Sequence, residues 1–143
     1  MQVVFIIAIF FLISPCAAFA AERYTVVGKT ANIRTGPGTK YDVFCKAEKY
    51  YPLNIIKKSG NWYKVKDFEG DVGWIHKSLV KKMLSVITIK PKCNIRSGPG
   101  TKYLVVFQTN EGVPFKVIKR NGKWINVQHS EGHKGWIHES LVW

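Results

Sequence analysis

The sequence of 143 residues is poor in acidic residues, in cysteine and in helical periodicity. Nine aspartate and glutamate residues stand against 22 lysine and arginine residues, so the formal net charge is +13. Three cysteines are too few for a dense disulfide framework. Because no window shows sustained 3.6-residue periodicity, we expect no helix beyond a single turn near His76 to Leu79.

The first twenty residues carry no charged side chain. They consist of an apolar run over residues 3–13, a break at Pro15 and small residues that end in Ala18-Phe19-Ala20. This layout predicts a secretory signal peptide over residues 1–20. The alternative is a retained membrane anchor, but a span needs about twenty uninterrupted apolar residues and this run meets Pro15 too early. We therefore expect no membrane span after signal cleavage. The expected location is the periplasm or cell envelope of the exporting cell.

All charged side chains follow residue 20, so the exported part is strongly basic. Such a surface attracts polyanions through a field that salt screens and that depends little on sequence. Nucleic acid is the default partner of a basic cytosolic protein, and export argues against it here. Export points instead to anionic envelope polymers such as lipid headgroups, lipopolysaccharide or peptidoglycan carboxylates. The alternative is a soluble surface whose high net charge has no specific partner.

An internal repeat organises the chain after residue 20. The segment Asn-Ile-Arg-Thr-Gly-Pro-Gly-Thr-Lys-Tyr at 32–41 returns at 94–103 with serine in place of the first threonine. At the same offset of 62, residues 24–80 and 86–142 are identical at 25 of 57 positions. We therefore expect two domains, residues 21–80 and 86–143, joined by a linker over residues 81–85. A linker of this length spans at most roughly 17 Å, so the domains should be close neighbours.

Each repeat carries β signals throughout. Short runs rich in Val, Ile, Tyr and Trp are separated by Gly, Pro, Asn and Asp at intervals of about ten residues. Five or six short strands in such a small unit are typical of a barrel, which removes exposed strand edges. In the first repeat we expect strands at Tyr24 to Val27, Ala31 to Arg34, Val43 to Ala47, Tyr51 to Lys57, Trp62 to Lys66 and Gly73 to His76.

The repeated motif is followed in both units by Gly-x-Trp, about twenty residues on, and then by Gly-Trp-Ile-His. In this order the motifs resemble the bacterial SH3-like family. The resemblance covers both repeats and implies an all-β fold of two tandem small SH3-like β-barrels after the signal peptide. Members of this family are targeting or binding modules in many envelope proteins and cell-wall hydrolases.

The Gly-Pro-Gly segment forms the long loop after the second strand, the counterpart of the SH3 specificity loop. The fold uses the groove beside this loop for extended peptides, although the loop could also be only a turn. Trp74 and Trp136 are expected in the core, whereas Trp62 and Trp124 suit core or groove equally. Tyr50 has no counterpart in the second repeat, so the two grooves should differ. The predicted ligand-binding residues are Arg34, Tyr41, Tyr50 and Trp62 in the first repeat, with Arg96, Tyr103 and Trp124 in the second.

Two cysteines remain after the signal, one in each repeat. An oxidising compartment predicts a disulfide between Cys45 and Cys93, and a pair of small buried thiols is the alternative. Neither cysteine lies in a setting that would activate a thiol nucleophile.

The four histidines show neither an HExxH motif nor a paired-cysteine spacing, so no metal site is expected. His76 and His138 match across the repeat and should serve the fold, while His129 and His133 flank a turn. Since no acid pair stands out either, we expect no catalytic residues and no cofactor.

The leading hypothesis is thus a non-catalytic envelope protein that binds peptidoglycan or its stem peptides. The alternative is a scaffold or chaperone-like subunit that binds an envelope protein partner. A cell-wall hydrolase is the weakest of the three.

Overall fold

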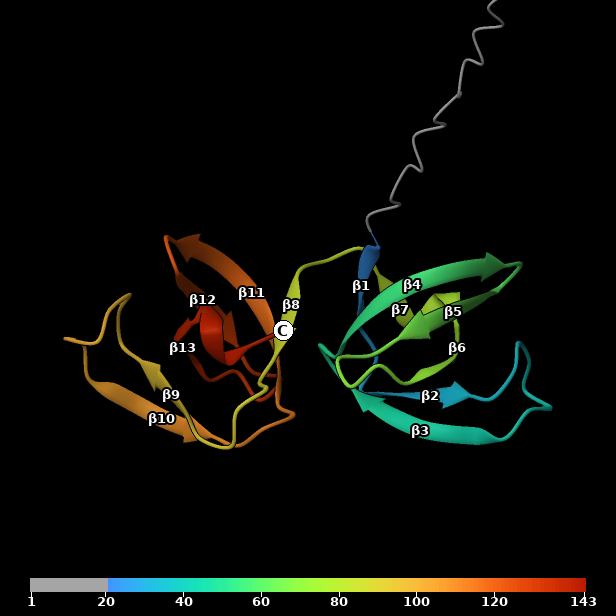
Figure 1. Cartoon of the computed structure of the whole chain (residues 1–143), viewed down its shortest axis with the longest axis horizontal. Coiled ribbons are helices and arrows are strands. Elements are labelled where there is room, and N and C mark those ends of the chain that lie inside the picture. Colours follow the sequence, from blue (N-terminus) through green and yellow to red (C-terminus); the bar gives the residue numbers. More distant parts are fainter. Residues whose placement is uncertain (1–20) are drawn as a thin grey trace, which may run out of the picture.

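The computed structural model describes residues 21–143 (Figure 1). The predicted signal peptide lies outside the described residues. Within the part of the chain that is described, no helix has both the length and the apolar character to cross a membrane.

The described chain folds into two antiparallel sheets, one for each repeat, as the sequence predicts. The first domain contains β1 (Glu22–Val26), β2 (Thr30–Arg34), β3 (Val43–Glu48), β4 (Pro52–Ser59), β5 (Trp62–Lys66), β6 (Val72–His76), the 3₁₀ helix η1 (Lys77–Leu79) and β7 (Val80–Lys81). The second contains β8 (Ser85–Ile87), β9 (Cys93–Arg96), β10 (Val105–Thr109), β11 (Pro114–Asn121), β12 (Trp124–Gln128), β13 (Lys134–His138) and the 3₁₀ helix η2 (Glu139–Leu141). The all-β fold class is confirmed, and the expected single turn after His76 is η1.

The two sheets share one topology. The strand orders are β3-β2-β6-β5-β4-β1-β7 and β10-β9-β13-β12-β11-β8, so corresponding strands occupy corresponding places. Each sheet curls into a small barrel, and the barrels stand side by side (Figure 1). The hairpins β4–β5 and β11–β12 turn at Gly60 and Gly122, whose φ angles of 59° and 60° suit glycine in a tight hairpin.

Buried and exposed side chains alternate along the strands, so the core of each domain is filled by residues from one face of its sheet. In β6 Gly73 and Ile75 are buried, while Trp74 and His76 lie half-buried on the other face. The expectation that Trp74 and Trp136 are core residues is therefore wrong. The Gly-Trp-Ile-His motif fixes an alternation but not its phase, and the β-branched isoleucine takes the inner position in both repeats.

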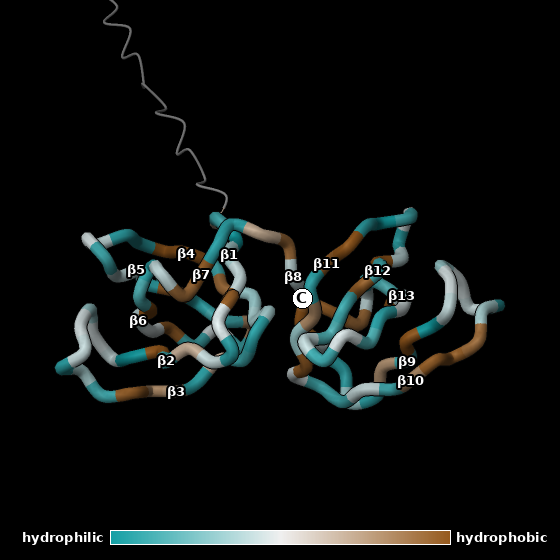
Figure 2. Tube along the Cα trace, turned by 180° about the vertical axis from the view of Figure 1, so that it is seen from behind, coloured by the Kyte–Doolittle hydropathy of each residue, from teal (hydrophilic) through white to brown (hydrophobic). Residues whose placement is uncertain are grey.

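The outer edge strands β3 and β10 carry exposed apolar side chains. Phe44 is 49% exposed and Val106 is 50% exposed, while the adjoining Leu104 is 79% exposed. The hydrophobic stretch of β10 is visible at the far end of the second domain (Figure 2). These strands lie at one end of each sheet order, so no strand among residues 21–143 pairs with their outer edges.

The short connection buries polar contacts between the domains. The Thr25 hydroxyl donates to the carbonyl of Met83 at 2.7 Å, and the hydroxyls of Thr25 and Ser85 lie 2.6 Å apart. The Arg23 guanidinium lies 3.6 Å from the centre of the Trp143 ring, and the C-terminus sits between the barrels (Figure 1). This stacking favours a fixed arrangement of the two domains over domains that move independently.

The predicted disulfide between Cys45 and Cys93 is wrong in this structure, where both cysteines are free thiols. Cys93 is fully buried in the core of the second domain, and its thiol donates to the Lys90 carbonyl at 3.5 Å. Cys45 is half-buried and packs against the core of the first domain. Because each side chain belongs to its own core, pairing them would require both barrels to open.

Both thiols should react slowly at neutral pH. Burial raises the pKa of Cys93, and burial together with Asp67 and Asp71 raises the pKa of Cys45. A raised pKa lowers the thiolate fraction, which is the reactive form. We expect titration with a thiol reagent to label Cys45 slowly in the native protein, faster as pH rises, and Cys93 only after unfolding. If unreduced, unfolded protein contains no free thiol, Cys45 and Cys93 form the disulfide after all.

Candidate functional site

Each domain carries a groove at the same place on its surface. The first has a volume of about 320 Å³ and the second about 350 Å³. The first is lined by Thr30, Asn32, Arg34, Thr39, Trp62, His76 and Leu79. The second is lined by Lys92, Asn94, Arg96, Thr101, Trp124, His138, Ser140 and Leu141. Six of the seven residues in the first groove recur unchanged at the offset of 62, which far exceeds the identity of the repeats as a whole.

The outer faces of three neighbouring strands build the groove. In the first domain β2 supplies Asn32 and Arg34, β5 supplies Trp62, and β6 supplies His76. Trp62 pairs with His76 across β5 and β6, so the two rings stand next to each other. Alternation makes this the face turned away from the core, and the groove residues are therefore available to a ligand.

Arg34 holds the Gly-Pro-Gly loop against the groove. Its Nη1 donates to the carbonyl of Thr39 at 3.2 Å and to that of Tyr41 at 2.9 Å. Arg96 makes the same two bonds in the second domain, at 3.2 Å to Thr101 and 3.0 Å to Tyr103. The arginine is thus a positioning residue for the loop as well as a charge on the groove wall.

Tyr41 and Tyr103 close the loop but do not line the groove. The ring of Tyr41 packs directly on Gly36, where a Cβ would lie far inside van der Waals contact with the ring. The same contact joins Tyr103 and Gly98. The repeated Gly-Pro-Gly-Thr-Lys-Tyr segment is therefore a folded unit in which the first glycine makes room for the tyrosine ring.

A hydrogen-bonded histidine supports each groove tryptophan. The ring centres of Trp62 and His76 lie 5.3 Å apart at 88°, and those of Trp124 and His138 lie 5.2 Å apart at 81°. His76 Nδ1 accepts the Ser78 N–H at 3.2 Å and caps η1. A neutral ring held in this way carries its proton on Nε2, so the groove gains a donor beside an aromatic face.

Tyr50 lies outside the groove, contrary to the prediction. It occupies the turn between β3 and β4 with a φ of 72°, and its N–H donates to the Val26 carbonyl at 2.8 Å. Gly112 fills this position in the second domain with a φ of 80° and makes the same bond to Thr88. The Tyr50 and Gly112 difference is therefore a matter of turn geometry, and it does not make the two grooves unlike.

The structure brings together Arg34 and Trp62, and likewise Arg96 and Trp124, among the predicted site residues. Sequence reasoning missed the asparagine, threonine, histidine and leucine that complete each groove. The signal that could have found them is their identity across the repeats at outward-facing strand positions, where the fold alone requires no particular side chain. The main difference between the grooves is Thr30 against Lys92, which makes the second groove more basic.

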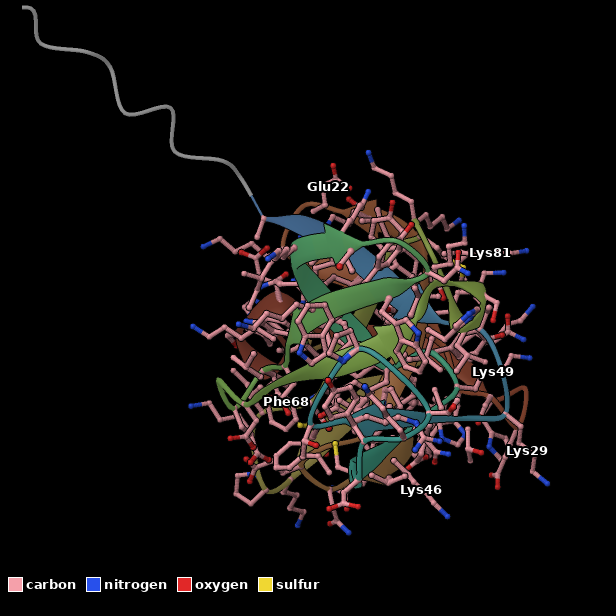
Figure 3. All side chains as sticks on the ribbon, turned by 90° about the vertical axis from the view of Figure 1, so that its right-hand side faces the viewer. Glu22, Lys29, Lys46, Lys49, Phe68 and Lys81 are labelled. Atoms are coloured by element: carbon pink, nitrogen blue, oxygen red, sulfur yellow. The ribbon has the colours of Figure 1, made fainter. Side chains whose placement is uncertain are left out.

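Several lysines lie together on one side of the first domain. Lys29, Lys46 and Lys81 are exposed and Lys49 is half-buried, all on one side of the first domain (Figure 3). This basic edge adds a long-range attraction for anionic ligands, and salt weakens that attraction.

The family model described as bacterial SH3 domain matches residues 27–82 and 90–143. The chain therefore belongs to the bacterial SH3 domain family, and the match covers both barrels.

Relatives include proteins named as cell-wall enzymes. A Bacillus subtilis protein named "Putative N-acetylmuramoyl-L-alanine amidase YrvJ" is 26% identical over 151 residues, which cover 98% of this chain and 29% of that protein. A Staphylococcus epidermidis protein named "Probable cell wall amidase LytH" is 44% identical over 52 residues, which cover 36% of this chain and 18% of that protein. The solved structure of NlpC1 from Trichomonas vaginalis aligns with a TM-score of 0.41 and 13% identity, over 94% of this chain and 50% of that one. The chain spans less than a third of the length of either amidase.

Proposed function

We propose that this protein binds peptidoglycan of the cell envelope through its two equivalent grooves and catalyses no reaction. The observation that carries the proposal is the recurrence of the groove lining, with asparagine, arginine, threonine, tryptophan, histidine and leucine unchanged between the repeats. Two copies of one groove suit a ligand that is itself a repeating polymer, because both sites can then engage one molecule.

The groove chemistry suits a stem peptide with its carboxylates and amides. The guanidinium of Arg34 presents charged donors to a carboxylate, and Asn32 offers both a donor and an acceptor to a peptide group. Trp62 and Leu79 provide apolar surface for the aliphatic parts of the chain. The lysines on one side of the first domain attract an anionic polymer to the protein.

The part of this chain that matches the relatives consists mainly of its two bacterial SH3 domains, which supports a binding role. Its alignment with the Bacillus subtilis protein leaves most of that protein without a counterpart in these 143 residues. A role at the cell wall, in the periplasm or envelope, accords with the names of both relatives.

Five indole N–H signals report directly on this proposal, since the chain has five tryptophans. In a nuclear magnetic resonance titration with a soluble muropeptide, we expect the indole signals of Trp62 and Trp124 to shift together. The signal of Trp143 should stay in place because its ring is stacked against Arg23 between the domains. Single Trp→Phe variants assign the signals.

The same titration follows the fate of the ligand. The muropeptide spectrum should broaden or shift without new signals, since we propose binding and no bond cleavage. A titration in which Trp62 and Trp124 stay fixed, or in which cleaved products accumulate, would contradict the proposed function.

A further inference from the structure

The turn between β12 and β13 gathers two imidazoles and a carboxylate that the grooves do not use. His129, Glu131 and His133 each offer one ligand atom, and these atoms all lie within 4.8 Å of one another. Glu131 Oε2 lies 3.8 Å from His129 Nδ1 and 3.9 Å from His133 Nδ1. We propose that this turn is a binding site for a divalent transition metal ion of the Zn²⁺ class.

The backbone of the turn sets the two histidines opposite each other. The His129 N–H donates to the His133 carbonyl at 2.8 Å, and the Gly132 N–H donates to the His129 carbonyl at 2.9 Å. Gly132 has a φ of 97°, which glycine adopts readily. Directly opposed residues in an antiparallel pair project to the same side of the sheet. Glu131 is then held at the tip of the turn, between the two rings.

One of the three side chains is largely buried, whereas the other two are exposed and can rotate towards a metal ion. The His129 ring lies 5.5 Å from the ring of the fully buried Phe115, and the His133 ring lies 5.9 Å from that of Phe107. The side chain of His129 is 19% exposed, whereas those of His133 and Glu131 are 67% and 73% exposed. Ligand atoms of tetrahedral zinc lie roughly 3.4 Å apart, so closure needs only small rotations of the two exposed side chains.

The ligand set selects the class of metal. Two imidazoles with one carboxylate suit Zn²⁺, Cu²⁺ or Ni²⁺, whereas Ca²⁺ and Mg²⁺ prefer sites built wholly from oxygen. The lone pair of His129 Nδ1 accepts the Glu131 N–H at 3.3 Å, and a metal ion bound at Nδ1 would replace this long hydrogen bond. Among the described residues Glu131 pairs only with the two histidines, so its charge is available to the ion. Three protein ligands leave one position of a tetrahedron open.

The first domain provides a built-in comparison. Asp67, Glu69 and Asp71 stand at the three equivalent positions, so that turn has no imidazole. Asp67 Oδ1 accepts the N–H groups of Glu69 and Asp71, both at 2.9 Å, and is thereby committed to the backbone of the turn. The proposed site is thus specific to the second domain.

Calorimetric titration of tag-free protein with ZnCl₂ tests the proposal. A Cys45→Ser background in every arm removes the accessible thiol as a competing ligand. We expect one Zn²⁺ per chain and a zinc-dependent rise in melting temperature, because an ion that binds only the folded state stabilises it. His129→Asp plus His133→Asp, which copies the first domain, should weaken zinc binding at least tenfold. Glu111→Gln, which removes an exposed carboxylate elsewhere in the same domain, should leave zinc binding unchanged.

A second measurement keeps the test independent of the double variant's stability. Exposed Glu131→Gln and His133→Ala should remain folded, and each should also weaken zinc binding at least tenfold. In the Cys45→Ser protein, zinc should shift the imidazole C–H signals of His129 and His133 but not that of His76. The proposal is overturned if zinc binds all these variants equally, if it shifts other histidines instead, or if it does not bind at all.

Discussion

Gly135→Ala should lower the melting temperature of the second domain by roughly 10–20 °C, an unfolding cost of about 3 kcal/mol. A Cβ at this position would lie far inside contact with Ile95 Cγ2, 3.0 Å from the Arg96 carbonyl oxygen and 3.3 Å from Val106 Cγ2. Ile95 is fully buried, so its side chain has no room to retreat. The backbone of β9 would have to move away from β13, which opens the sheet where the groove is built.

Gly100→Ala is the matched control in the same domain. Its Cβ would meet the Tyr103 ring at 3.5 Å, which is ordinary van der Waals contact. We expect a change within about 0.5 kcal/mol in calorimetric unfolding. If Gly135→Ala has the same melting temperature as the wild type, the close approach of β9 and β13 does not constrain the fold.

The fold could be predicted largely because the chain repeats itself. The repeat gives the domain count, and the glycines before Trp62 and Trp124 mark hairpins that the structure forms at the expected places. The strand at Trp62–Lys66 has the predicted bounds. These features depend on local turn chemistry and on alternation, which a sequence displays directly.

The sequence could not predict which residues of each strand face the core, or which side chains from distant segments lie close together. Trp74 and Ile75 are neighbours of similar apolarity, and only packing decides which of them turns inward. Tyr50 was predicted in the groove because it is an aromatic residue near the loop in sequence. Nearness in sequence does not show on which side of the barrel a side chain lies. Cys45 and Cys93 looked like partners because compartment and number allow a bond, while the two separate cores that hold them emerge only in three dimensions.

Removing both groove tryptophans should weaken binding to insoluble peptidoglycan by on the order of 1,000-fold. A central aromatic side chain in a binding site commonly contributes about 2 kcal/mol, and two grooves on one polymer multiply their separate losses. Trp62→Ala plus Trp124→Ala removes the largest apolar surface from each groove and leaves the net charge unchanged. Circular dichroism and the melting temperature establish that the double variant is folded.

Ile56→Ala plus Ile118→Ala is the matched control. These residues occupy equivalent positions in the two repeats, are 52% and 42% exposed, and lie outside both grooves. The control pair therefore removes one exposed apolar side chain from each domain without touching the proposed site. It should bind peptidoglycan as well as the wild type.

Co-sedimentation with insoluble peptidoglycan in low salt and in about 0.5 M salt tests the central claim most directly, because at the higher concentration the Debye length falls to a few ångströms. The account predicts that wild-type protein and the isoleucine control still sediment in high salt, while the folded double tryptophan variant sediments only weakly in low salt and not in high salt. The contrary result is wild-type binding that vanishes in high salt together with a tryptophan variant that binds as well as wild type in low salt. In that case the basic surface binds the wall and the two grooves do not.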